Sequence, residues 1–185
     1  MTLWLLRHAL PQVAPGTCYG QLDIPADAEA TLACARQLVK NISPTIRIFS
    51  SPLQRCEQLA KALIRLEPNL TIKTDARLQE MDFGQWENRA WASIPEAELT
   101  DWTQSFASYP AGATGETVTG FMARVAGAFD DFAAGGADTL WITHAGVIRA
   151  AGLIARGTRC ISRADQWPAG APAYGQWCKL QHPPV

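Results

Sequence analysis

Short segments rich in apolar and β-branched residues recur along this chain and predict strands. Four of them read TLWLLR (2–7), IRIFS (46–50), LTIKTD (70–75) and DTLWIT (138–143). A fifth, AYGQWCKL (173–180), lies in a tail rich in proline and glycine and predicts an edge strand. The chain therefore carries enough strand segments for one sheet.

Between these segments, apolar residues recur at helical spacing. A helix capped by Asp27 is expected to run to about Asn41. Residues 117–133 predict a longer amphipathic helix that stops near Gly135-Gly136, because glycine tolerates positive φ. A last helix is expected in AGVIRAAGLIARG, directly after the fourth strand.

Two capping boxes are predicted. An S-x-x-Q box over residues 51–54, with Pro52 at the first helical position, begins a helix that runs to about Leu66. An S-x-x-E box over residues 93–96 begins a helix in a segment rich in aromatic residues. Both predictions rest on a serine side chain that accepts a free N–H of the first turn.

The alternation of strands and helices predicts an α/β fold. We expect a three-layer α/β/α arrangement with a mostly parallel central sheet covered on both faces. In such sheets ligands bind beyond the carboxyl ends of the strands. Residues at the strand tips are therefore the first candidates for chemistry.

Composition agrees with one globular domain. The 185 residues are 48% hydrophobic and 18% charged, which suits a packed core and argues against disorder. The formal net charge is −1, with 16 basic and 17 acidic residues. We therefore expect neither nucleic acid nor a membrane surface as a partner, and any anion must be recognised locally.

Five cysteines occur, without a C-x-x-C pair. An odd number without metal-ligand spacing argues against a disulfide framework or a zinc cluster and favours reduced thiols in the cytoplasm. No apolar run is long enough to span a bilayer, and the first one is too short for a signal peptide. A cytoplasmic location is expected.

Two of the three histidines end predicted strands. His8 follows LWLLR, and His144 follows LWIT. Parallel strands place their carboxyl ends at one edge, so the two imidazoles are expected to lie together. The alternative for each is a strand end whose ring binds a backbone carbonyl. His182 lies in the proline-rich tail and is expected to be a surface bystander.

Two arginines lie where they could hold an anion. Arg7 adjoins His8, and Arg55 lies in the first turn of the second predicted helix, where free N–H groups and the helix dipole favour negative charge. A guanidinium adds paired donors that match phosphate oxygens. The alternative for Arg55 is a surface ion pair with Glu57 or Glu67.

Glu80 is the candidate proton donor. It lies in the sequence LQEMDFG, and desolvation by apolar neighbours favours the protonated form of a carboxyl. The alternatives are an ion pair between Glu80 and Arg77, or a donor role for Glu87 or Glu116.

Together these segments resemble the histidine phosphatase superfamily, also called the phosphoglycerate mutase-like family. LLRHA resembles its Arg-His-Gly signature, SSPLQRCEQLAKAL its second-arginine segment, and LQEMDFGQWE its acid-bearing segment. GET with the helix after it resembles GES…RV, and WITHAGVIRAA resembles the second-histidine segment. The five segments stand in the family's order over most of the chain. Within the family, the CYGQLDIP loop and the compact length most resemble α-ribazole phosphatases of the cobalamin pathway.

The resemblance implies a role for each candidate. His8 would be the nucleophile and form a phosphohistidine. Arg7, Arg55 and His144 would hold the phosphoryl oxygens, and Glu80 would protonate the leaving oxygen and then activate water. Phosphoryl transfer depends mainly on positioning and charge stabilisation, which these residues can supply without a metal or a cofactor.

The chain departs from the family pattern beside the nucleophile. The family's glycine is Ala9 here, which costs roughly 1 kcal/mol if that position needs positive φ. Pro11 and Ala14 replace two polar residues that contact phosphate. Three residues of the same loop could replace those contacts: Thr17, Tyr19 and Gln21. We expect Tyr19 and Gln21 to bind substrate.

The family also implies a cap that covers the substrate, at about residues 81–115 of a single domain spanning 1–185. Three tryptophans fall in it and either stack on a planar leaving group or pack the cap: Trp86, Trp91 and Trp102. The expected substrate is a small phosphomonoester, with α-ribazole phosphate as the specific candidate. The alternatives are a phosphoglycerate mutase, whose relatives are usually longer, and a binding protein that has lost catalysis. The oligomeric state is not predicted.

Overall fold

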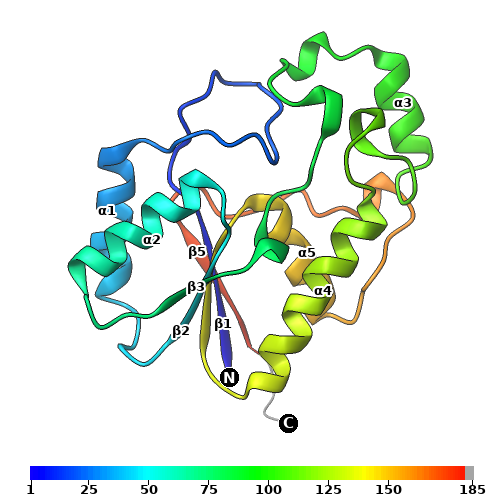
Figure 1. Cartoon of the computed structure of the whole chain (residues 1–185). Helices are drawn as coiled ribbons and strands as arrows, with labels where there is room; N and C mark the ends of the chain where they lie inside the picture. The colour runs from blue at the N-terminus through cyan, green and yellow to red at the C-terminus, as the bar shows by residue number, and fades with distance from the viewer. Residues whose placement is uncertain (182–185) are drawn as a thin grey trace.

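A five-stranded sheet runs through the centre of the protein in the order β3-β2-β4-β1-β5 (Figure 1). In this computed structural model, which describes residues 1–181, the first four strands are parallel and β5 runs antiparallel beside β1. The strands are β1 (Thr2–Arg7), β2 (Arg47–Ser50), β3 (Ile72–Thr74), β4 (Thr139–Thr143) and β5 (Trp177–Gln181). The predicted α/β fold with a mostly parallel sheet is confirmed, including the edge strand near the C-terminus.

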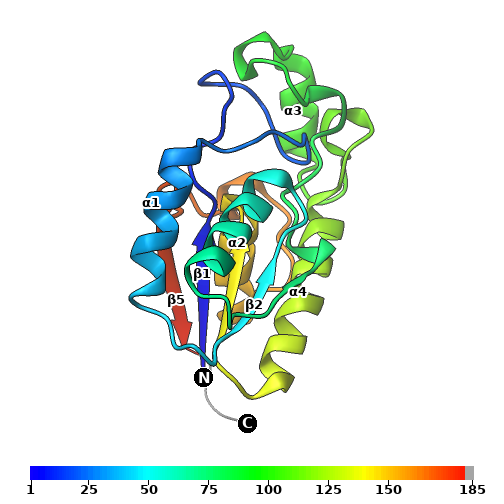
Figure 2. The ribbon, with the colours of Figure 1, turned by 60° about the vertical axis from the view of Figure 1, so that its left-hand side comes forward.

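Helices cover both faces of this sheet. Within the described part of the chain the α-helices are α1 (Ala28–Val39), α2 (Gln54–Leu66), α3 (Glu96–Gln104), α4 (Val118–Gly135) and α5 (Ala145–Ala155). Figure 2 shows α1 and α2 on one side of the sheet and α4 on the other. The helix α4 ends at Gly135 and is capped by Gly136, whose φ of 65° is the left-handed conformation expected there.

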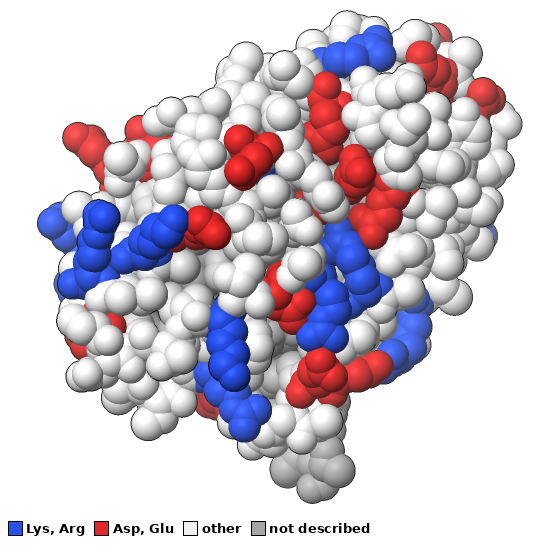
Figure 3. Space-filling view, viewed as in Figure 1, with Lys and Arg blue, Asp and Glu red and all other residues white. Residues whose placement is uncertain are grey.

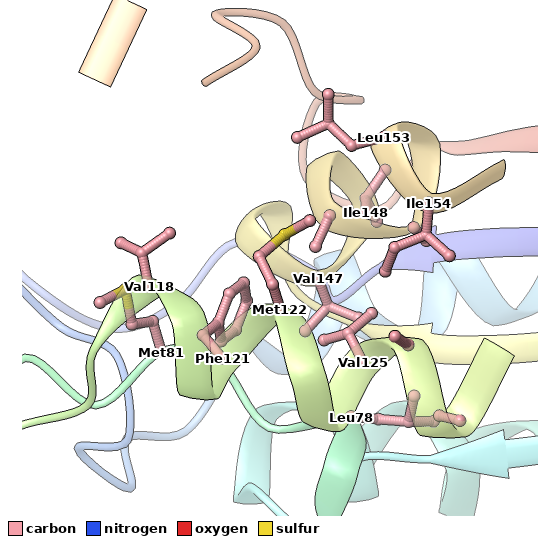
Figure 4. Packing of buried hydrophobic residues seen from close by; sticks show 14 of the residues in the cluster. Leu78, Met81, Val118, Phe121, Met122, Val125, Val147, Ile148, Leu153 and Ile154 are labelled. Atoms are coloured by element: carbon pink, nitrogen blue, oxygen red, sulfur yellow. The ribbon is translucent and has the colours of Figure 1, made fainter. Parts of the chain in front are cut away.

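The alternation of side chains along β1 explains the two packed faces. Leu3 and Leu5 are fully buried against α4 and α5, whereas Trp4 and Leu6 point to the opposite face and pack with α1 and α2. Figure 4 shows the core on the face covered by α4 and α5, where apolar residues of these two helices interdigitate. Burial of apolar surface on both faces stabilises β1 as an interior strand, between β4 and β5.

Both predicted capping boxes are wrong, although both helices exist. The helix α2 begins at Gln54, and the carboxylate of Asp23, from the loop between β1 and α1, accepts its N–H at 2.7 Å. Ser51 has its hydroxyl beside His144 instead, at 2.8 Å from Nε2. The helix α3 has Pro95 at its N-cap without a side-chain hydrogen bond, and Ser93 donates to the carbonyl of Ala90. At α2, a carboxylate from a distant loop therefore accepts the N–H expected for Ser51, and at α3 Pro95 occupies the N-cap position expected for Ser93.

Two loop segments lie beyond the carboxyl ends of the strands and contact each other. Residues 11–25 form a loop at the top of Figures 1 and 2, beside the segment that contains α3. Cys18 and Arg89 join the two, since the N–H of Cys18 donates to the carbonyl of Arg89 at 2.7 Å. Gly20 contacts the second segment so closely that a Cβ would overlap the carbonyl oxygen of Met81. These loops enclose the strand tips, and a covering role for residues 81–115 stays a prediction.

Charged side chains are mixed over the surface. On the face shown in Figure 3, basic and acidic groups are interspersed, without a broad patch of one sign.

None of the helices in residues 1–181 has both the length and the apolar character that a membrane span needs. His182 lies outside the described residues, so its predicted place on the surface stays a prediction.

Candidate active site

The two histidines lie side by side at neighbouring strand tips. The strands β1 and β4 are parallel neighbours with Arg7 opposite Thr143, so the next residues, His8 and His144, emerge together. Their ring centroids are 5.1 Å apart, and the N–H of His8 donates to the carbonyl of Thr143 at 3.0 Å. The sheet register therefore creates the histidine pair that the two matching sequence segments predict.

His8 is held as a neutral imidazole with a defined tautomer. Its Nδ1 lies 2.7 Å from the carbonyl oxygen of Ala9, and a carbonyl only accepts, so Nδ1 carries the proton. The lone pair therefore belongs to Nε2. Burial lowers the pKa of His8 to about 3, assisted by the positive charges of Arg55 and Arg7. A neutral ring with a free lone pair is the form that a nucleophile needs.

Ala9 itself is not strained. It is buried, and the described non-glycine residues with positive φ are Asn88 and Ala113. The family's glycine is therefore not required here for its backbone conformation, and the replacement leaves the nucleophile's neighbour in ordinary geometry.

His144 is completely buried beside the first histidine. Its Nε2 lies 2.8 Å from Oγ of Ser51 and 3.5 Å from Sγ of Cys56, while Nδ1 is buried without a partner among the described residues. Burial, together with the charge of Arg55, holds the pKa of His144 well below its ordinary value. An unpartnered buried ring nitrogen is costly, and a phosphoryl oxygen is one group that would satisfy it.

Arg7 is oriented by an aromatic ring that the sequence did not reveal. Its guanidinium carbon lies 3.8 Å from the ring centroid of Tyr174, and Nη1 donates to the carbonyl of Pro172 at 3.1 Å. The hydroxyl of Tyr174 also lies 2.6 Å from that of Tyr19. Tyr174 shortly precedes the strand that pairs with β1, so only the strand order brings its ring to Arg7.

Arg55 is fully buried in the first turn of α2, so the alternative of a surface ion pair is wrong. Its guanidinium donates to the carbonyls of Leu22, at 2.9 Å, and Gly20, at 2.5 Å. Its charge acts on both histidines, as their lowered pKa values show. A direct contact between Arg55 and phosphate stays a prediction.

The carboxylate of Glu80 is held by backbone donors rather than by Arg77. It accepts the N–H of Gly146 at 2.9 Å and the N–H of Met81 at 3.1 Å. The approach of Glu80 to the start of α5 requires a glycine, because a Cβ at Gly146 would overlap Oε1 of Glu80. Arg77 pairs with Asp75 at 2.7 Å, so the predicted alternative partner is occupied elsewhere.

The rival carboxylates have structural partners. Glu87 accepts four backbone N–H groups at 2.8–3.0 Å, from Gly20, Gln21, Leu22 and Phe83. Glu116 binds Arg124 through two hydrogen bonds of 2.8 and 2.9 Å. The oxygens of Glu87 are therefore committed to the backbone of the surrounding loops, and those of Glu116 to a side chain of α4.

A cleft of about 330 Å³ opens over this cluster. His8, Arg7 and Glu80 line it, together with Thr17, Gly16, Tyr19, Trp91, Ala145, Tyr174 and Arg149. Arg149 was missed, although it stands five residues after His144 on the helix that begins at the strand tip. Gln21 donates its side-chain amide to the carbonyl of Glu80 at 3.2 Å, and its contact with substrate stays a prediction.

The comparisons with known proteins agree with this arrangement. The family model of the histidine phosphatase superfamily (branch 1) matches residues 3–167. The chain belongs to the histidine phosphatase superfamily. The predicted resemblance is thereby confirmed at the level of the family, and the chain is a phosphatase.

Solved structures share the fold of this phosphatase. A mycobacterial glucosyl-3-phosphoglycerate phosphatase in complex with VO3 is 25% identical, with a TM-score of 0.77 over 97% of this chain and 92% of that chain. The protein TTHB049 from Thermus thermophilus is also 25% identical, with a TM-score of 0.71 over 100% of this chain and 95% of that one. A structure described as mycobacterial hydrolase 2 is 24% identical and shows the fold alone, with a TM-score of 0.76 over 96% and 80% of the two chains. None of the curated proteins compared with the sequence matches it.

Proposed function

We propose that this phosphatase hydrolyses phosphomonoesters through a phosphohistidine on His8. The observation that carries the proposal is the state of the His8 ring, which is neutral and donates from Nδ1 to the carbonyl of Ala9. Nε2 is then the nucleophilic nitrogen, in a cleft that Arg7 and Glu80 also line.

The proposed reaction has two steps. Nε2 of His8 forms a bond to phosphorus while the ester P–O bond breaks, and Glu80 gives its proton to the leaving oxygen. Water then attacks the phosphohistidine, Glu80 takes the proton from that water, and the N–P bond breaks to release phosphate. The covalent intermediate divides one difficult displacement into two easier ones.

Cationic and polar groups stabilise the transferred phosphoryl group in this proposal. Arg7 lines the cleft, the ring of His144 lies 5.1 Å from that of His8, and the charge of Arg55 acts on both histidines. Two guanidinium charges can offset the charge of the phosphoryl oxygens without a metal ion. The described residues include no cluster of three or more His, Cys, Asp or Glu side chains that could hold a metal. Metal independence remains a prediction, to be tested by activity in EDTA.

The two alternatives have less support. The binding-protein alternative relied on changes beside the nucleophile, but Ala9 sits in ordinary backbone geometry. A protein that only binds phosphate also has no need of a carboxylate held in the same cleft as the nucleophile. The mutase alternative predicts isomerised phosphoglycerate instead of free phosphate, and the two products distinguish it from hydrolysis.

The substrate is proposed to be a small-molecule ester, with α-ribazole phosphate as a specific candidate supported by the CYGQLDIP loop. The mycobacterial relative is described as a glucosyl-3-phosphoglycerate phosphatase, which offers a second candidate ester. The five cysteines are free thiols, which supports a reducing compartment such as the cytoplasm. Initial rates on the two esters would rank the candidates.

The decisive experiment is to trap the phosphoenzyme. The protein is incubated with para-nitrophenyl phosphate in EDTA, quenched rapidly in base, and digested for mass spectrometry. We expect an acid-labile phosphate on His8, its absence in a His8→Ala variant, and inhibition of turnover by vanadate. Turnover in the wild type without phosphate on His8, or equal turnover by His8→Ala, would overturn the proposal.

A further inference from the structure

An apolar pocket of about 370 Å³ adjoins the catalytic cleft. It lies between the end of α3, the first turns of α4 and α5, and the loop around residues 164–169. None of the proposed chemical steps uses it. It is as large as the cleft over His8, and its size falls within the range of small-molecule sites.

Aromatic pairs form the walls of this pocket. Trp102 and Phe106 contact each other with ring centroids 5.0 Å apart, and Phe121 lies 6.0 Å from Trp167. Met81 lines the same space beside the acid-bearing segment. Such walls favour a flat or bulky apolar group, because ring faces and edges supply contact area but few hydrogen bonds.

The two cavities meet at Glu80 and Arg149, each of which lines both of them. They are the charged side chains among the described residues that line the apolar pocket. Away from this boundary the walls hold no charge to pair with an ionised ligand. An ionised group of a ligand that entered further would lose water without meeting a charge of opposite sign.

We propose that this pocket binds the leaving group, and that the preferred substrates are phosphate esters of uncharged alcohols with an aromatic or bulky apolar body. The inference rests on the proposed function, because it takes Glu80 as the proton donor. The leaving oxygen must lie at the Glu80 carboxyl when the P–O bond breaks. The carbon skeleton attached to that oxygen then has the apolar pocket directly beside it, while the phosphoryl group stays over His8.

The test compares two esters that differ only in apolar bulk. Ethyl phosphate and naphthylethyl phosphate both release a primary alcohol of similar acidity, so their chemical reactivity is nearly equal. Each apolar carbon that leaves water favours binding, and we expect kcat/KM to be at least about tenfold higher for naphthylethyl phosphate. Glycerol phosphate, which has the same kind of leaving oxygen but two further hydroxyls, should resemble ethyl phosphate.

A matched pair of variants on α3 locates the effect. Thr103 is exposed and lines the pocket, whereas Thr100 is exposed on the same helix and does not line it. We expect Thr103→Trp to fill the pocket and lower kcat/KM for naphthylethyl phosphate about tenfold, leaving ethyl phosphate unchanged. Thr100→Trp should leave both esters unchanged. Unaltered turnover of ethyl phosphate also reports that each variant is folded.

The outcomes separate the inference from the function on which it rests. Equal kcat/KM for ethyl and naphthylethyl phosphate in the wild type would overturn the pocket assignment while leaving a phosphatase. An apolar preference that survives Thr103→Trp would overturn it as well. If neither ester nor para-nitrophenyl phosphate were hydrolysed by folded protein, the proposed function itself would fail.

Discussion

Replacing Gly146 with alanine should displace the proton donor without touching the nucleophile. The Cβ of the new residue would overlap Oε1 of Glu80 and lie 3.0 Å from its Cδ, although non-bonded carbon atoms prefer about 3.5–4.0 Å. The flexible end of Glu80 must therefore retreat by roughly 1 Å, and a misplacement of this size costs about 10²-fold in rate. General acid catalysis contributes about 10²–10⁴-fold, so a loss of this size is within its range.

The assay uses two esters with different needs for a proton. Ethyl phosphate releases a poor leaving group, and its kcat/KM should fall about 10²-fold in Gly146→Ala, or about 3 kcal/mol of transition-state stabilisation. Para-nitrophenyl phosphate releases a stable phenolate that needs no proton, so its kcat/KM should change by roughly threefold or less. The contrast between the two esters identifies Glu80 as the group that moved.

Gly152→Ala is the matched control on the same helix. A Cβ there would meet Nη1 of Arg156 at 3.7 Å, which is an ordinary contact, and alanine favours a helix by roughly 0.5–1 kcal/mol over glycine. We expect unchanged activity on both esters. Wild-type turnover of ethyl phosphate by folded Gly146→Ala, or an equal loss on both esters, would refute the reasoning that Glu80 acts as the donor from its observed position.

Two further predictions concern stability. Folding holds the pKa of His8 at about 3, below its unfolded value of 6.5, so the unfolded chain binds a proton first as the pH falls. The stabilisation from a neutral His8 is thus complete above about pH 6.5 and should decrease by about 2 kcal/mol at about pH 5. Urea unfolding of the wild type and of His8→Asn at the two pH values measures this share: the loss of stability between them should be about 2 kcal/mol smaller in the variant, while the share due to His144, whose pKa is also lowered, remains. Glu87→Ala should lower the unfolding free energy by about 3 kcal/mol, because four backbone N–H groups lose their acceptor. Urea unfolding measures the change, and a loss below about 1 kcal/mol would contradict the role of Glu87 in holding the loop.

The periodic features of the chain predicted most of the fold. A continuous apolar run predicted the strand at residues 2–7, and helical spacing predicted the helix after Asp27, whose carboxylate caps it as expected. Such signals are local, because each depends on residues within one or two turns or a few strand positions. The caps of α2 and α3 were wrong because a cap needs one specific acceptor, and Asp23, from a distant loop, takes the place at the first turn of α2 that was expected for Ser51.

The sequence predicted those residues of the candidate site that end a strand or begin a helix. His8, Arg7 and His144 follow from strand ends, and the parallel register of β1 and β4 brings the histidines together. Arg149 and Tyr174 line the same cleft but were not predicted. Tyr174 comes from the far end of the chain, and its approach to Arg7 depends on β5 pairing with β1.

The sequence by itself determined that the chain builds a mostly parallel sheet with a histidine, an arginine and a carboxylate available at its edge. Tertiary structure alone decided the state and surroundings of those groups. The neutral tautomer of His8 requires burial and the carbonyl of Ala9, and the position of Glu80 requires the missing side chain of Gly146. Burial, hydrogen bonds and close approach are properties of the assembled fold, because residues distant in the chain supply the partners.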